Sequence, residues 1–151
     1  MSHMEMVLVV SVSIIRDDEV LMIKENKSTA RDKWNFPSGR IEYGEDILHA
    51  ACREVKEETG YEVGLQATTG VYQFISHTNN QILLFHFTAE IIGGHLNLQE
   101  EEISDSAWVK VCDLEKCSHE GLREPKVIMQ IIDNLIKEKL YSINLFNKQI
   151  L

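Results

Sequence analysis

Seven acidic side chains crowded into one short stretch constrain this chain more than any other feature. They are Glu42, Glu45, Asp46, Glu54, Glu57, Glu58 and Glu62. On a helix, where successive residues turn by about 100°, Glu54, Glu57 and Glu58 fall on one face within one turn. Any fold for this chain must therefore accommodate three neighbouring carboxylates on one helical surface.

A helix over residues 46–58 is predicted from its ends. Asp46 is a favourable N-cap, and Gly60 stands just past the last turn, where a left-handed cap suits glycine. Three apolar side chains form the stripe that should pack on the core: Leu48, Cys52 and Val55. His49 and Lys56 point the opposite way, toward solvent.

The three carboxylates carry an energetic cost. Like charges at i, i+3 and i+4 destabilise an exposed helix by roughly 0.2–0.5 kcal/mol per pair, and the helix dipole disfavours anions near the C-terminal end. A hard divalent cation such as Mg²⁺ or Mn²⁺ removes the conflict, since it prefers carboxylate oxygen. The alternative is a solvated acidic face whose charges are balanced by Arg53 and Lys56.

Length and charge narrow the class of protein. The 151 residues suit one domain, placed at 4–140, with 1–3 interpreted as a cloning remnant and 141–151 as a C-terminal tail. Lys plus Arg number 15 and Asp plus Glu 24, which gives a formal charge of −9. This acidic balance argues against a nucleic-acid or membrane-surface partner, but a bound cation can still attract an anionic small molecule.

The sequence pattern also bears on location. The apolar runs fall short of the roughly eighteen residues of a spanning helix, and a basic segment with a cleavage site is not found. Cys52, Cys112 and Cys117 form no CxxC pair, which favours reduced thiols and a cytoplasmic protein.

Alternation and turn residues predict five strands, over residues 6–15, 20–23, 70–77, 81–92 and 108–111. The polar stretch 25–33 is interpreted as a loop. A wide apolar stripe predicts a second helix within residues 124–140, most simply packed on a sheet. Strands around two helices, without strict alternation, favour an α+β or mixed α/β sandwich.

A second pattern runs through residues 39–61. Gly39 is followed after five residues by Glu45, and after seven more by Arg53-Glu54-Val55-Lys56-Glu57-Glu58-Thr59-Gly60-Tyr61. This resembles the signature box of the Nudix (MutT-like) hydrolases at every fixed glycine, glutamate and arginine. The one departure is Tyr61, where the family prefers an aliphatic residue. The resemblance implies an α/β/α sandwich with a central mixed β-sheet.

The resemblance also implies an activity. Nudix hydrolases cleave a nucleoside diphosphate linked to another group, by attack of water on phosphorus with the help of Mg²⁺ or Mn²⁺. Carboxylates suit this chemistry because metal ions must neutralise the charge that builds up on phosphoryl oxygens. Glu57 and Glu58 would be the principal metal ligands, and Glu54 a further ligand or the base that activates water.

Other residues receive supporting roles from the same resemblance. Arg53 would orient a glutamate of the box, Glu45 would pair with Arg53, and Gly39 would permit a tight loop. The carbonyl of Ser38 would be a backbone ligand to the metal. Glu102 is the candidate for a further carboxylate from a later loop, although a solvated acidic loop over 100–102 is the competing interpretation.

Three residues are candidate substrate contacts: Trp34, Arg40 and Arg123. Trp34-Asn35…Pro37 and Leu122-Arg123-Glu124-Pro125 are similar to a bacterial subgroup that acts on nucleoside di- and triphosphates and on thiamine-precursor pyrophosphate. The expected partner is thus a small nucleotide or pyrophosphate compound. Many members of the family are dimers, so a homodimer is compatible with the resemblance.

Two other classes share the expected fold. A non-catalytic module that senses nucleotides usually has an eroded box, whereas this box is intact. An isopentenyl diphosphate isomerase needs a catalytic cysteine and further metal-binding histidines. His77, His86 and His95 are available, but their spacing is that of strands and loops.

Overall fold

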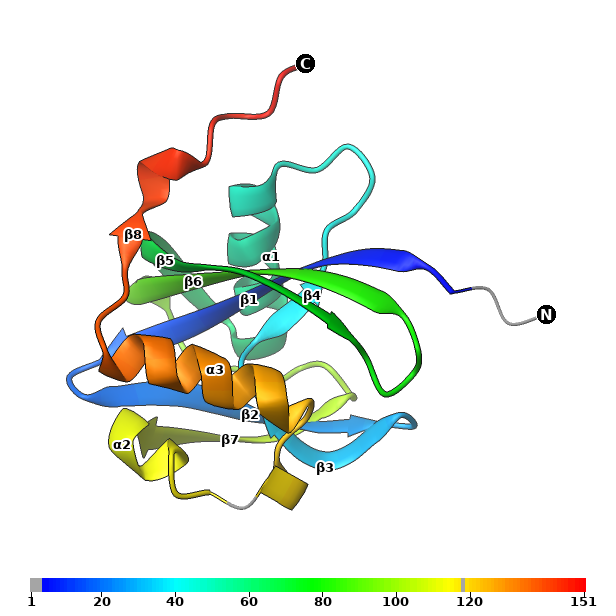
Figure 1. Cartoon of the computed structure of the whole chain (residues 1–151). Coiled ribbons are helices and arrows are strands. Elements are labelled where there is room, and N and C mark those ends of the chain that lie inside the picture. Colours follow the sequence, from blue (N-terminus) through cyan, green and yellow to red (C-terminus); the bar gives the residue numbers. More distant parts are fainter. Residues whose placement is uncertain (1–3, 118) are drawn as a thin grey trace.

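The strands form one eight-stranded sheet in the computed structural model, which describes residues 4–117 and 119–151 (Figure 1). The strands are β1 (Met6–Arg16), β2 (Glu19–Lys27), β3 (Ala30–Asn35), β4 (Ser38–Arg40), β5 (Tyr61–Ile75), β6 (Gln81–Gly94), β7 (Ile103–Lys110) and β8 (Tyr141–Ser142). The helices are α1 (Ile47–Thr59), α2 (Val111–Leu114) and α3 (Pro125–Ile136), with single 3₁₀ turns η1 (His119–Gly121) and η2 (Ile143–Leu145). Residues 1–3, interpreted as a cloning remnant, lie outside the described residues.

The sheet contains both parallel and antiparallel pairs, and β1 and β2 pair with each other over only a short stretch. Its order is β3-β2-β1-β6-β5-β8, with β4 beside β1 and β7 beside β2. β1 and β6 run parallel, while the other pairs are antiparallel. β2 joins β1 only at Ile15 and Arg16, because β4 occupies the edge of β1 farther back. The predicted mixed α/β sandwich is confirmed.

Two cores form on the two faces of the sheet, because successive strand side chains point to opposite sides. Val10, Val12 and Ile14 of β1 face α1, and Val7 faces α3. Figure 1 shows α1 and α3 on opposite sides of the strands. Four buried side chains anchor α3: Val127, Ile128, Ile131 and Ile132.

The caps predicted for α1 are confirmed, but its buried stripe differs from the prediction. The Asp46 side chain accepts hydrogen bonds from the first turn, and Gly60 ends the helix in the left-handed region at φ 85°. The fully buried apolar side chains are Ala50, Ala51 and Val55, whereas Leu48 and Cys52 are only partly buried. Small alanines let the helix approach the sheet closely.

Several predicted boundaries were wrong. Residues 25–33 form a hairpin of β2 and β3 instead of a loop, because the hairpin pairs its backbone while most of its polar side chains, Glu25 excepted, stay in water. β5 begins at Tyr61 and β7 at Ile103, earlier than predicted. Register shifts in β5 break the alternation that would have revealed its first half. α3 ends at Ile136, four residues before the predicted end.

The C-terminal tail packs on the domain. β8 pairs with β5, and the Phe146 ring lies edge-on to Phe87 with the ring centroids 5.0 Å apart. The Gln149 backbone N–H donates to Asp46 Oδ1 at 3.0 Å, which ties the tail to the start of α1. Among the described residues, no helix is long and apolar enough to cross a membrane.

Candidate active site

Glu54, Glu57 and Glu58 form the α1 carboxylate cluster, on the edge of α1 that faces β4. Glu58 is 3% exposed, and its Oε1 accepts a hydrogen bond from the Ser38 backbone N–H at 2.8 Å. Burial raises the pKa of Glu58 well above its ordinary value. Burial also raises the pKa of Glu54, against the opposing effect of Arg53. In both cases burial penalises the ionised carboxylate more than the neighbouring donors and cations stabilise it.

Arg53 holds several carboxylates through a single guanidinium. Its Nε and Nη2 donate to the two oxygens of Glu45 at 2.6 and 2.9 Å, a bidentate pair. Its Nη1 donates to Glu54 at 2.9 Å and to Glu57 at 3.2 Å, and Nη2 also reaches the Arg40 carbonyl at 3.1 Å. The hydrogen bonds from Arg53 lower the pKa of Glu45 to about 2. Arg53 therefore links the loop before α1 to the cluster.

Gly39 leaves the space that the Glu54 carboxylate occupies. A Cβ atom built on Gly39 would overlap with the Glu54 carboxylate group. The requirement at this position is therefore close approach of backbone to side chain, since Gly39 does not adopt a positive φ.

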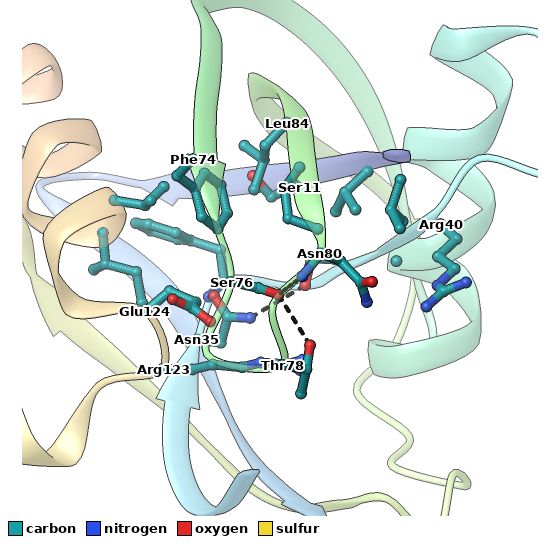
Figure 2. Close-up of a pocket in the computed structure, with 18 of the residues that line it drawn as sticks. Ser11, Asn35, Arg40, Phe74, Ser76, Thr78, Asn80, Leu84, Arg123 and Glu124 are labelled. Carbon is teal, nitrogen blue, oxygen red and sulfur yellow. Dashed lines mark hydrogen bonds between the residues drawn. The ribbon is translucent and has the colours of Figure 1, made fainter. Parts of the chain in front are cut away.

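A cavity of about 190 Å³ adjoins the cluster. Ser38 and Gly39 line this cavity and also contact Glu58 and Glu54, so the two regions share one wall. Apolar side chains of β1, β5, β6 and α3 form much of the lining (Figure 2). Polar and charged side chains complete the lining and include Lys27, Asn35, Asn80, Arg123 and Glu124.

Comparison with known proteins agrees with this geometry. The model of the NUDIX domain matches residues 6–129. The chain belongs to the Nudix hydrolase family. A solved NUDIX hydrolase from Nitrosomonas europaea superposes with a TM-score of 0.84 at 27% identity, over 95% of this chain and 97% of that one. The family resemblance of the 39–61 box is thereby confirmed.

Two curated relatives are similar to this chain over only part of their own length. A Caenorhabditis elegans protein named as a nudix hydrolase is 39% identical over 65% of this chain and 26% of its own length. The human protein named 8-oxo-dGDP phosphatase NUDT18 is 36% identical over 67% of this chain and 31% of its own length. The chain thus spans less than a third of either relative.

The oxygen donors of this Nudix domain suit a hard cation. The carboxylates of Glu54, Glu57 and Glu58 and the Ser38 carbonyl are the kind of ligand that Mg²⁺ and Mn²⁺ prefer. Within residues 4–117 and 119–151, no three acidic, histidine or cysteine side chains converge tightly enough to enclose a cation as they stand. Glu54 and Glu57 turn toward Arg53 instead. A cation would therefore have to draw these two carboxylates toward itself.

Of the three candidate substrate contacts, two line the cavity and one does not. Arg40 and Arg123 both line the cavity (Figure 2). Of the described residues, Trp34 lies outside the lining and packs against the core on the α3 side. Its carbonyl accepts a hydrogen bond from the Arg123 backbone N–H at 3.0 Å. Trp34 therefore supports the segment that carries Arg123, a role that its sequence position did not reveal.

The loop before β7 brings a different glutamate to the cluster from the one predicted. Glu102 is exposed, and its carboxylate lies 4.0 Å from Lys27 Nζ. Glu100 lines a hollow together with Glu57, and its negative charge contributes to the raised pKa of Glu54. The acidic run over 100–102 predicts a carboxylate near α1. Three consecutive glutamates do not indicate which of them faces the helix.

The histidines bear on the isomerase alternative. His86 is fully buried, with its ring nitrogens 2.5 Å from Ser11 Oγ and 2.6 Å from Ser13 Oγ. Burial lowers the pKa of His86 to about 3, so the ring is neutral. His77 contacts Glu124 and the Thr29 carbonyl. His95 lines the same hollow as Glu57 and Glu100, whereas neither His77 nor His86 lines it. Among the described residues, the three histidines are therefore not gathered at the α1 carboxylate cluster, as an isomerase would require.

Proposed function

We propose that this chain is a Mg²⁺-dependent pyrophosphohydrolase that cleaves a nucleoside di- or triphosphate, or a related nucleoside diphosphate compound, by attack of water on phosphorus. One observation carries the proposal. The α1 carboxylate cluster and the cavity share the backbone of Ser38 and Gly39. A substrate seated in the cavity would thereby present its phosphates to the carboxylates.

Each residue of the cluster has a part in this proposal. Glu57, Glu58 and the Ser38 carbonyl would hold the cation, which neutralises charge on the phosphoryl oxygens when bound. Glu54 would serve as a further ligand or accept a proton from the attacking water. Arg53 keeps Glu54 and Glu57 oriented through Nη1, and Glu45 fixes Arg53 from the other side.

The cavity suits the nucleoside part. Its apolar wall can pack against a flat base, and the polar groups of its lining can form hydrogen bonds. The human relative is named for action on 8-oxo-dGDP, which supports placing guanine nucleotides and their oxidised forms first among candidate substrates.

The test is a release assay over a substrate panel. Phosphate and pyrophosphate would be measured with Mg²⁺ and with a chelator, on nucleoside di- and triphosphates, 8-oxo-dGTP, ADP-ribose and thiamine-precursor pyrophosphate. We expect Mg²⁺-dependent release from at least one nucleotide. Tight nucleotide binding with no release from any member would replace the proposal by a nucleotide-sensing module.

A further inference from the structure

Glu25 is a buried carboxylate behind the polar part of the cavity lining. It lies on β2, outside the Nudix box, and is 1% exposed. Its Oε2 lies 2.7 Å from Arg123 Nη1 and 2.9 Å from Lys27 Nζ, and its Oε1 accepts a hydrogen bond from Asn35 Nδ2 at 3.1 Å. The hairpin of β2 and β3 and the segment before α3, 98 residues from Glu25 in the sequence, therefore meet on one carboxylate.

Three of these contacts are to side chains that line the cavity, namely Lys27, Asn35 and Arg123. Glu25 itself is not part of the described lining, so it stands behind the wall and holds the side chains in front of it. Burying a carboxylate is costly unless it is paired and hydrogen bonded. Here Lys27 and Arg123 both pair with the Glu25 carboxylate, and Lys27 also lies 4.0 Å from Glu102. The Arg123 donors that Glu25 does not use remain available at the cavity.

A guanidinium is well suited to this arrangement. It is planar, permanently charged and carries five N–H donors in a fixed fork. One donor of Arg123 is taken by Glu25, and this contact restricts the orientation of the whole plane. Arg123 is only 26% exposed, which limits competition from water for the donors that remain.

The same carboxylate is connected to the catalytic side. Asn35 Nδ2 donates to Glu25 and also to Ser38 Oγ at 3.2 Å. The Ser38 backbone N–H in turn donates to Glu58. Glu25 is thus linked by hydrogen bonds to the wall between the cavity and the α1 carboxylate cluster.

We propose that Glu25 is a positioning residue that fixes the Arg123 guanidinium so that it donates to an oxygen of the nucleotide in the cavity. The inference rests on the proposed function for the identity of the ligand as a nucleotide. That oxygen belongs either to a phosphate or to a carbonyl of the base, both of which accept hydrogen bonds from arginine. Glu25 acts only through Arg123 and does not contact the substrate.

The first test is Glu25→Gln, which keeps the shape and removes the charge. KM for dGTP should rise about tenfold while kcat changes less than about threefold, because orientation of a binding group is lost and the chemistry is not. KM does not depend on the fraction of folded enzyme, so a loss of stability would not mimic this result. The matched control is Glu19→Gln, on the same strand and away from the cavity, which should leave KM unchanged.

A double-mutant cycle separates positioning from a general structural role. Arg123→Met should raise KM at least as much as Glu25→Gln, and combining the two should add little. An unchanged KM in Glu25→Gln, or an equal increase in KM when Arg123 is already methionine, would overturn the inference. Should Glu25→Gln fail to fold, Arg123→Lys keeps the charge without the fork and must raise KM in the same way.

KM for a second nucleotide, dATP, identifies which part of the nucleotide carries the oxygen that accepts from Arg123. A KM penalty in Arg123→Met that is confined to dGTP assigns the acceptor to the base, since adenine lacks the carbonyl. An equal penalty on dATP assigns it to a phosphate. If the wild-type chain releases no phosphate at all, the proposed function fails, and the same variants would be compared by the dissociation constant for dGTP.

Discussion

Two clusters of glutamate and basic side chains flank the same cavity, and they differ in their balance of charge. In the α1 carboxylate cluster, Arg53 serves Glu45, Glu54 and Glu57, and Glu58 lies next to them. In the second, here called the Glu25 cluster (Glu25, Lys27, Asn35 and Arg123), one carboxylate serves two cations. The first therefore has a surplus of negative charge. In the second, Lys27 also lies 4.0 Å from Glu102, and the Arg123 guanidinium keeps N–H donors that Glu25 does not use.

The comparison shows that both clusters use glutamate and basic side chains, and that the groups left uncompensated in each cluster indicate what it would bind. A surplus of carboxylates is relieved by a divalent cation, which is what phosphoryl transfer to water requires. A surplus of fixed N–H donors is relieved by an oxygen acceptor on the ligand. One cavity wall thus separates a predicted metal site from a predicted recognition site.

The largest expected effect comes from removing one negative charge of the α1 carboxylate cluster. Glu57→Gln or Glu58→Gln should lower kcat by at least about a hundredfold, because the cation would lose a principal ligand. Folding, measured by thermal unfolding, should change little. Lys56→Gln is the matched control on the exposed face of the same helix. Wild-type turnover in both glutamate variants would contradict the assignment of the metal site.

The second effect tests the shared wall. Gly39→Ala places a methyl group where the Glu54 carboxylate lies, so Glu54 must move. We expect kcat to fall by about a hundredfold, since small displacements of catalytic groups cost rate steeply. Gly121→Ala, whose added methyl group would meet open space, should leave turnover unchanged. Equal rates in the two variants would show that the close approach at Gly39 does not matter.

The third prediction concerns stability and pH. The pKa of Glu45 is lowered to about 2 by Arg53, so its stabilising contribution is present above the ordinary pKa and is lost as the pH falls through about 4.5 toward 2. Glu45→Gln should therefore cost about 2 kcal/mol in the free energy of unfolding at pH 7. Urea unfolding should show this difference shrinking by pH 3. A difference that does not depend on pH would contradict the ion pair as its source.

The smallest effect distinguishes the two loop glutamates. Glu100 faces the α1 carboxylate cluster, whereas Glu102 contacts Lys27. Glu100→Gln should raise the Mg²⁺ concentration needed for half-maximal rate by about tenfold, and Glu102→Gln by less than about twofold. The reverse order would restore Glu102, the residue predicted from the sequence, as the additional carboxylate.

The two clusters also differ in how far they could be predicted. The α1 carboxylate cluster lies within one helix turn, so its geometry follows from helical spacing, and Arg53 with Glu45 lies only eight residues apart. The Glu25 cluster joins side chains 98 residues apart in the sequence, and local patterns carry no information on such a contact. Glu25 lay in a stretch interpreted as a loop for another reason: most side chains of 25–33 are polar and hide the strand pattern of the β2–β3 hairpin.

Binding of Mn²⁺ tests the central claim most directly. The free ion would be followed by electron paramagnetic resonance during titration of the wild-type chain, Glu57→Gln and Glu25→Gln. We predict a saturable site in the wild-type chain that is weakened at least about tenfold in Glu57→Gln and is unchanged in Glu25→Gln. Equal binding in the wild-type chain and Glu57→Gln, or loss of binding in Glu25→Gln alone, would contradict the division of roles between the two clusters.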